Sequence, residues 1–106
     1  MMYSKYGNRR TGGFDSRKEM KRFEELALLE RAGKISGLQR QVKFELIPNQ
    51  YKDGRCIYRK VSYIADFVYT QDGELVVEDS KGFRTPEYII KKKLMYQIHG
   101  IIIKET

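Results

Sequence analysis

The sequence predicts an α/β protein of the α+β type, in which helices pack on a mixed central sheet in the element order α-β-β-β-α-β. Two segments carry apolar residues at helical spacing between clear start and stop signals. The runs between and after them are rich in Val, Ile, Tyr and Phe, which favour strands. A length of 106 residues suits one domain. We therefore expect a flexible basic arm over residues 1–13 and a single domain over residues 14–106.

The first helix is expected directly after the segment FDS. Ser16 is placed to act as the N-cap, with Glu19 as its capping-box partner. Apolar residues that include Phe23 and Leu26 form a stripe along one side of this helix, and Gly33 supplies the stop signal.

Three strands are expected next. The segment QRQVKFELI alternates as a strand and ends at Pro48, and the segment NQYKDG after it predicts a loop. A long strand is expected over residues 57–69 and another over residues 74–80. Between them lies Asp72-Gly73, the strongest short signal for a hairpin. Core or sheet packing is expected for the strand tyrosines Tyr58, Tyr63 and Tyr69.

The second helix is expected within TPEYIIKKKLMYQIHG. Thr85 is its expected N-cap, Pro86 occupies the first helical position, and Gly100 lies just past the end. The segment IIIKE then predicts a short closing strand.

The charge balance points to a polyanionic partner. The chain has 21 Lys and Arg against 14 Asp and Glu, a formal net charge of +7, which favours nucleic acid or an anionic surface. A single cysteine excludes an internal disulfide and a cysteine-based zinc site. No apolar run approaches the about 18 residues of a membrane span, and the first residues lack the apolar region of a secretory signal. We expect a protein of the cytoplasm.

The predicted hairpin brings two acids together. A two-residue turn at Asp72-Gly73 makes residues 71 and 74 partners, which places Asp66 opposite Asp79. A four-residue loop would instead place the two acids diagonally, still on one face of the hairpin. Like charges so close repel each other.

The same register decides which other residues join the acids. Either even loop length places Ile64 and Val68 on the face of Asp79, together with Lys81. Glu78 then lies on the opposite face, and only an odd loop would exchange it for Asp79.

Two carboxylates on a largely apolar face need a cation. Lys81 supplies one positive charge, and a divalent metal would supply the remainder. Oxygen ligands of this kind suit Mg²⁺ or Mn²⁺, which bind through one or two carboxylates plus waters and substrate phosphate. The alternative is a buried Asp–Lys ion pair with a purely structural role.

Asp66, followed on the partner strand by Asp79-Ser80-Lys81, resembles the Asp…(Asp/Glu)-x-Lys signature of the PD-(D/E)xK nuclease superfamily. Ala65 stands where that motif often has proline. The segments FDSRKE and VVEDSKG resemble parts of phage Holliday-junction resolvases of the endonuclease I type. Over residues 13–104, the chain also resembles a phage and prophage family catalogued as a domain of unknown function.

This resemblance implies a restriction-endonuclease-like core and metal-dependent cleavage of DNA. Asp66, Asp79 and Glu19 would be the metal ligands, with the Ser80 carbonyl oxygen completing the coordination. Lys81 would position or activate the attacking water, or neutralise a phosphate oxygen. A role for Glu19 as a helix cap competes with its role at the metal.

Several basic residues are expected to contact DNA phosphates: Lys5, Arg9 and Arg10 in the N-terminal arm, and Arg84, Lys91 and Lys92 after the motif. The function expected is that of a Mg²⁺-dependent endodeoxyribonuclease, with branched DNA as a candidate substrate. A branched junction has two scissile strands, so this substrate would call for a homodimer. The alternatives are a non-catalytic nucleic-acid-binding module and a phage scaffold or regulatory protein.

Overall fold

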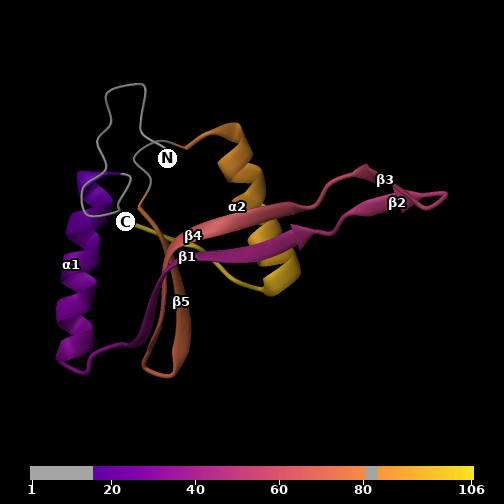
Figure 1. Ribbon diagram of the computed structural model, residues 1–106. Helices are drawn as coiled ribbons and strands as arrows, with labels where there is room; N and C mark the ends of the chain where they lie inside the picture. Colours follow the sequence, from indigo (N-terminus) through magenta and orange to yellow (C-terminus); the bar gives the residue numbers. More distant parts are fainter. Residues whose placement is uncertain (1–15, 81–83) are drawn as a thin grey trace.

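The computed structural model describes residues 16–80 and 84–106, and within these ranges it is a mixed α+β structure, as predicted (Figure 1). Two more strands are present than the predicted order contained. In chain order the elements are α1 (Arg17–Arg31), β1 (Ser36–Ile47), β2 (Gln50–Lys52), β3 (Arg55–Tyr58), β4 (Val61–Gln71), β5 (Glu74–Asp79), α2 (Pro86–His99) and β6 (Lys104–Glu105).

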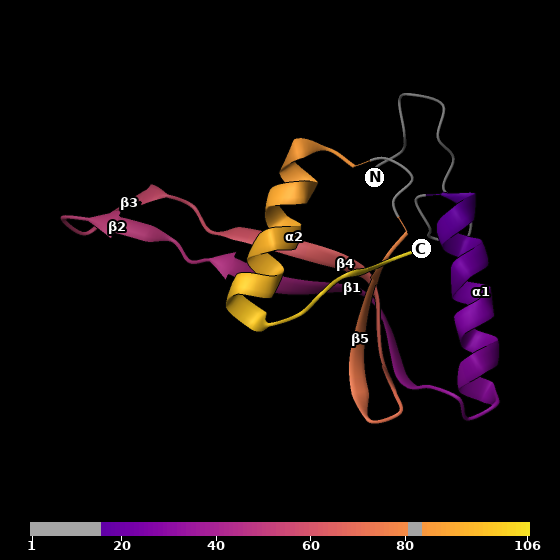
Figure 2. The same cartoon turned by 180° about the vertical axis from the view of Figure 1, so that it is seen from behind.

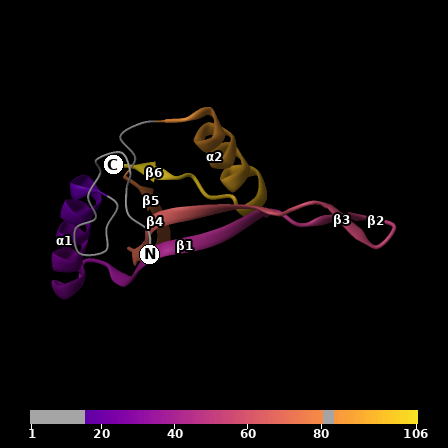
Figure 3. The ribbon, with the colours of Figure 1, turned by 45° about the horizontal axis from the view of Figure 1, so that its top comes forward.

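Four of the strands form one mixed sheet in the order β1-β4-β5-β6. The pairs β1–β4 and β4–β5 are antiparallel, whereas β5 and β6 are parallel. Parallel neighbours need a crossover connection. Here α2 provides it between β5 and β6, and Figure 3 shows β6 lying beside β5. No helix among the described residues is both long and apolar enough to cross a membrane.

Both helices begin and end at the predicted signals. The Ser16 hydroxyl accepts a hydrogen bond from the N–H of Glu19 at 3.1 Å, as expected of an N-cap. The Thr85 hydroxyl does the same for the N–H of Tyr88 at 3.0 Å. Gly100 has a φ of 69°, the left-handed conformation that ends a helix at little cost for glycine.

The register predicted for the second hairpin is confirmed from the turn as far as the pair Phe67–Glu78, which directly adjoins Asp66 and Asp79. Gln71 pairs with Glu74, so Asp72 and Gly73 alone form the turn, with φ values of 53° and 81°. These two positive φ values are those of the hairpin turn that Asp-Gly favours.

The loop predicted over NQYKDG is wrong. β2 and β3 pair there as a two-stranded sheet around Asp53-Gly54, a second Asp-Gly turn with positive φ at both residues. The predicted strand over residues 57–69 is therefore divided, and β4 begins only at Val61. Tyr58, expected to pack in the core or sheet, is 65% exposed.

The helices cover opposite faces of the sheet at β5 (Figures 1 and 2). Val77 of β5 packs in a cluster with Tyr88 and Met95 of α2. Val76 packs against a second cluster, which contains Leu26 of α1. Because neighbouring residues of a strand point to opposite faces, each face of β5 has its own helix.

The alternation of β4 side chains between the two faces of the sheet shifts by one residue at Asp66, since Val68 still packs in the α2 cluster. Tyr63 and Ala65 belong to the α2 cluster, whereas Phe67 and Tyr69 belong to the α1 cluster. The prediction that Ile64 shares the buried face of Val68 is accordingly wrong, since Ile64 is 47% exposed. Across the sheet, Gln41 lies between the pairs Arg40–Phe67 and Val42–Ala65 and has a φ of 54°. The backbone is thus distorted beside Asp66.

Candidate functional site

Asp66 and Asp79 lie on neighbouring strands and are both buried, with exposures of 9% and 0%. The backbone N–H of Ser80 donates a hydrogen bond to Oδ2 of Asp66 at 2.7 Å. Asp66 therefore reaches across the hairpin to the residue that directly follows Asp79. The structure brings together three of the residues that the sequence placed at the site.

Tyr63 forms a hydrogen bond with the carboxylate of Asp79. Its hydroxyl donates to Oδ2 of Asp79 at 2.6 Å. Burial, together with this hydrogen bond, raises the pKa of Tyr63, so the phenol remains a donor at neutral pH. Sequence reasoning assigned Tyr63 only a packing role. A buried tyrosine hydroxyl needs a polar partner, but the sequence does not show which one.

Glu19 takes part in the helix cap through its backbone N–H, and its carboxylate has a partner in β1 instead of the cap. Its N–H donates to the Ser16 cap, while its carboxylate is 4% exposed and accepts from Nε2 of Gln41 at 2.9 Å. Gln41 lies in β1 between the residues that pair with Ala65 and Phe67 of β4. Glu19 is thus held one strand away from Asp66, through a residue that no sequence pattern indicated.

The oxygen donors suit a hard divalent cation. Within residues 16–80 and 84–106, no set of three or more His, Cys, Asp and Glu side chains is arranged to hold a metal. Mg²⁺, however, usually takes only one or two carboxylates and fills its other positions with water and phosphate. A carboxylate that accepts one hydrogen bond has further acceptor sites. Asp66 and Asp79 therefore fit this ion, and Lys81 lies outside the described residues.

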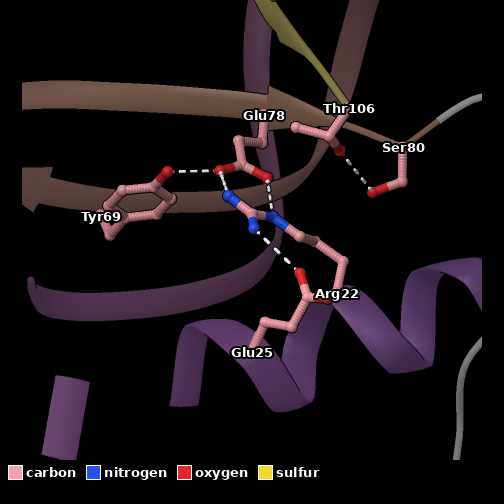
Figure 4. Close-up of polar contacts among 6 residues, drawn as sticks. All are labelled: Arg22, Glu25, Tyr69, Glu78, Ser80 and Thr106. Atoms are coloured by element: carbon pink, nitrogen blue, oxygen red, sulfur yellow. Dashed lines mark hydrogen bonds and ion pairs between the residues drawn. The ribbon is translucent and has the colours of Figure 1, made fainter. Parts of the chain in front are cut away.

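Glu78, next to Asp79, serves a different purpose on the α1 face (Figure 4). Arg22 donates to both of its carboxylate oxygens, at 2.9 and 2.7 Å, and the Tyr69 hydroxyl also donates to it. Burial acts to raise the pKa of Glu78, but the hydrogen bonds from Arg22 and Tyr69 outweigh burial and lower it. Burial and the bond to Glu78 raise the pKa of Tyr69 to about 12. Glu78 is therefore a paired structural acid, and it lies on the face opposite Asp79, as the register predicted.

The hydroxyl of Ser80, just after β5, contacts the hydroxyl of Thr106. Ser80 Oγ lies 3.2 Å from Thr106 Oγ1, as Figure 4 shows, and the N–H of Thr106 donates to the Asp79 carbonyl at 3.0 Å. The chain segment that carries Asp79 is thus held on both sides, by β4 and by residues after α2.

Three of the cations predicted to contact DNA form ion pairs. Arg84 and Lys92 both bind Glu105, the latter at 3.1 Å, and Lys91 binds Glu87 at 3.0 Å. Such partly exposed pairs contribute little to stability. The predicted contacts Lys5, Arg9 and Arg10 lie outside the described residues.

A cavity of about 460 Å³ is lined in part by Tyr63, whose hydroxyl binds Asp79, while neither acid is among the described residues that line it. Its lining includes the cations Lys43 and Lys91, and also Thr85 and Glu87 at the start of α2. The start of α2 and Lys43 contribute positive potential here, whereas Lys91 is already paired with Glu87 at 3.0 Å.

Removal of one hydroxyl near this cavity tests the electrostatics of the site. Tyr88 donates to Glu105 Oε2 at 2.7 Å, and this bond is the largest cause of the lowered pKa of Glu105, followed by Lys92 and Arg84. We expect Tyr88→Phe to raise the Glu105 pKa toward its ordinary value, as measured by ¹³C NMR titration of the carboxyl.

The lowered pKa of Glu105 also determines how this residue affects stability as the pH changes. A carboxyl whose pKa is lower in the folded state stabilises the protein above its unfolded pKa, and this contribution is lost as the pH falls through the folded pKa. Tyr88→Phe should therefore weaken the acid dependence of unfolding. An unchanged Glu105 titration in this variant would contradict the assigned cause.

Residues 4–103 match a family model described as "Protein of unknown function (DUF1064)". The matched region contains Glu19, Asp66 and Asp79, together with the whole β4–β5 hairpin. No curated protein and no solved structure gives a significant match to the chain.

Proposed function

This chain belongs to the DUF1064 family, and we propose that it is a metal-dependent endonuclease that hydrolyses phosphodiester bonds in DNA. One observation carries the proposal. Asp66 and Asp79 are buried on adjacent strands, and Asp66 is bonded at 2.7 Å to the N–H that follows Asp79. Burying two neighbouring carboxylates is costly unless a cation offsets their charge. A divalent ion would offset it, and such an ion could also activate the water and stabilise the charge in phosphodiester hydrolysis.

Each residue of the proposed active site would have a separate role. Asp66, Asp79 and the Ser80 carbonyl would hold Mg²⁺ or Mn²⁺, with Glu19 beside them. When bound, the metal would lower the pKa of its water and stabilise charge on the phosphate. Lys81 would position the attacking water or neutralise a phosphate oxygen.

Three further contacts would keep the acids in place. Tyr63 orients Asp79, the Ser80 N–H orients Asp66, and Gln41 orients the Glu19 carboxylate. Such supporting hydrogen bonds to metal ligands typically change metal affinity or activity by about 10- to 100-fold when removed.

DNA is the polymer that best fits the rest of the molecule. The net charge is +7, and the cavity beside Tyr63 is lined by Lys43 and Lys91. We extend the proposal to branched, junction-like DNA, to a homodimer with one site for each scissile strand, and to a phage or prophage protein that acts in the cytoplasm of the host.

A specific observation also favours a second candidate, a non-catalytic nucleic-acid-binding module. Asp66 and Asp79 each accept a hydrogen bond from the protein itself, from Ser80 and Tyr63. Glu78 shows that a buried acid in this hairpin can be fully structural, since Arg22 and Tyr69 bind it.

One experiment separates the two candidates. The protein is incubated with branched, linear double-stranded and single-stranded DNA, with Mg²⁺ and with EDTA. The nuclease proposal predicts products that appear only with Mg²⁺, most rapidly from the branched substrate. Binding without cleavage under all conditions would support the binding module and overturn the nuclease.

A further inference from the structure

A two-stranded ribbon projects from the body of the molecule (Figures 1 to 3). We define the ribbon as residues 50–60: β2, the Asp53-Gly54 turn, β3, and Arg59 and Lys60 at its base. Every residue in it is exposed, and among the described elements β2 and β3 make extensive contacts only with each other. An isolated two-stranded hairpin is only marginally stable in water. Contact with a partner molecule would therefore stabilise this ribbon.

The charges of the ribbon identify the chemistry of that partner. It carries four cations, Lys52, Arg55, Arg59 and Lys60, against the single acid Asp53. Within the described part of the chain, none of these four cations forms an ion pair, whereas Arg22, Arg84 and Lys91 of the body are each paired with a glutamate. The ribbon therefore presents positive charge that the protein itself does not neutralise.

The pairing of the strands concentrates this charge at the tip. Lys52 lies directly opposite Arg55, so the two cations share one face of the ribbon. Like charges in this position destabilise a hairpin. A bound anion would remove this repulsion. Tyr51 and Tyr58, which are 63% and 65% exposed, add side chains that can hydrogen-bond to phosphate or pack on sugars.

We propose that the ribbon docks in the major groove of duplex DNA, with Lys52 and Arg55 on phosphates of the flanking backbone. A two-stranded β-ribbon fits the width of this groove. The inference rests on the proposed function, which makes DNA the substrate, and it adds a second DNA contact outside the acid pair. A second copy of the ribbon is a poor partner for the first, because two such ribbons would repel each other.

The single cysteine of the chain provides a direct test, because Cys56 is exposed within the ribbon, directly opposite Tyr51. A thiol-reactive photo-crosslinker is attached to Cys56, and the protein is irradiated with labelled duplex DNA in EDTA, where no cleavage occurs. We expect a protein–DNA crosslink that competitor DNA suppresses. The matched control, Cys56→Ser with Lys34→Cys, moves the label to the exposed segment after α1 and should give little product.

Binding measurements supply an independent readout. The double variant Lys52→Ala with Arg55→Ala should raise Kd about tenfold or more at moderate salt and reduce the slope of log K against log salt by about 2. The control, Arg31→Ala with Lys34→Ala, removes the same charge from the far end of α1 and should change Kd by less than about threefold. Both pairs are exposed, so both proteins should fold.

The outcomes distinguish this inference from the proposed function. If wild type binds duplex through the ribbon but cleaves nothing with Mg²⁺, the nuclease proposal fails and the ribbon inference stands. If the protein cleaves DNA but the ribbon variant binds like the control, the inference fails and the nuclease stands. Crosslinks from Cys56 that join only two protein chains, or equal DNA crosslinking from both labelled positions, would also overturn it.

Discussion

We expect Asp79→Asn to reduce Mg²⁺-dependent cleavage of DNA by about a hundredfold to a thousandfold or more, while the protein remains folded. Asparagine has nearly the shape of aspartate and keeps an oxygen that can accept from the Tyr63 hydroxyl. It lacks the negative charge that attracts a divalent cation. Asp66→Asn should have an effect of similar size, because its oxygen can still accept from the Ser80 N–H.

The same hairpin offers a matched control. Asp72 lies in the exposed turn and has a φ of 53°, which asparagine also adopts readily. Asp72→Asn removes one negative charge from β4–β5 without touching the acid pair, so its cleavage rate should equal that of wild type. The proposal would be contradicted if Asp79→Asn cleaved as fast as Asp72→Asn at saturating Mg²⁺, in rates measured on the same labelled DNA.

The second large effect concerns stability. We expect Arg22→Met to lower the free energy of unfolding at pH 7 by about 3–5 kcal/mol, as measured by urea denaturation. Glu78 is fully buried, and Arg22 binds both of its carboxylate oxygens. Methionine keeps the apolar stem of arginine but leaves the Glu78 charge buried without its cation, although the Tyr69 hydroxyl still donates to it.

The pH dependence of this variant supplies a further check. In wild type, Arg22 and Tyr69 lower the pKa of Glu78 despite its burial, so Glu78 stabilises the fold above its unfolded pKa. This contribution is lost as the pH falls through the folded pKa. Without Arg22, burial should instead raise the Glu78 pKa, and protonation at acidic pH should reduce the deficit.

Two controls complete this experiment. Arg31→Met, in the exposed last turn of α1, should change stability by less than about 0.5 kcal/mol. Adding Glu78→Gln to Arg22→Met should restore part of the lost stability, because the buried charge is then removed. A loss below about 1 kcal/mol in Arg22→Met alone would show that the ion pair does not hold α1 on the sheet.

The sequence predicted those parts of the fold that depend on local signals. Thr85, Gly100 and the Asp72-Gly73 turn each have a conformational preference that neighbours did not override. The ribbon was missed although Asp53-Gly54 is the same kind of turn. Its flanking residues lack an apolar face because β2 and β3 pack on no core, so the alternation that identifies a strand is weak.

The residues of the candidate site were likewise predictable only where local sequence signals determine their position. The hairpin register predicted that Asp66 and Asp79 lie on neighbouring strands near each other, but it did not predict the change of face at Asp66. The roles of Tyr63 and Gln41 did not follow from it, because they depend on how distant segments meet. The contact of Gln41 with Glu19 joins β1 to α1, and the positive φ of Gln41 has no sequence signal comparable to a glycine.

Whether Asp66 and Asp79 bind a divalent ion is decided by diffraction from crystals soaked in Mn²⁺ and measured near the manganese absorption edge. We expect an anomalous peak about 2.1 Å from carboxylate oxygens of both Asp66 and Asp79. The same soak of Asp66→Asn with Asp79→Asn should show no peak there. A manganese ion bound elsewhere in wild type, with these two carboxylates remote from it, would contradict the proposed metal site.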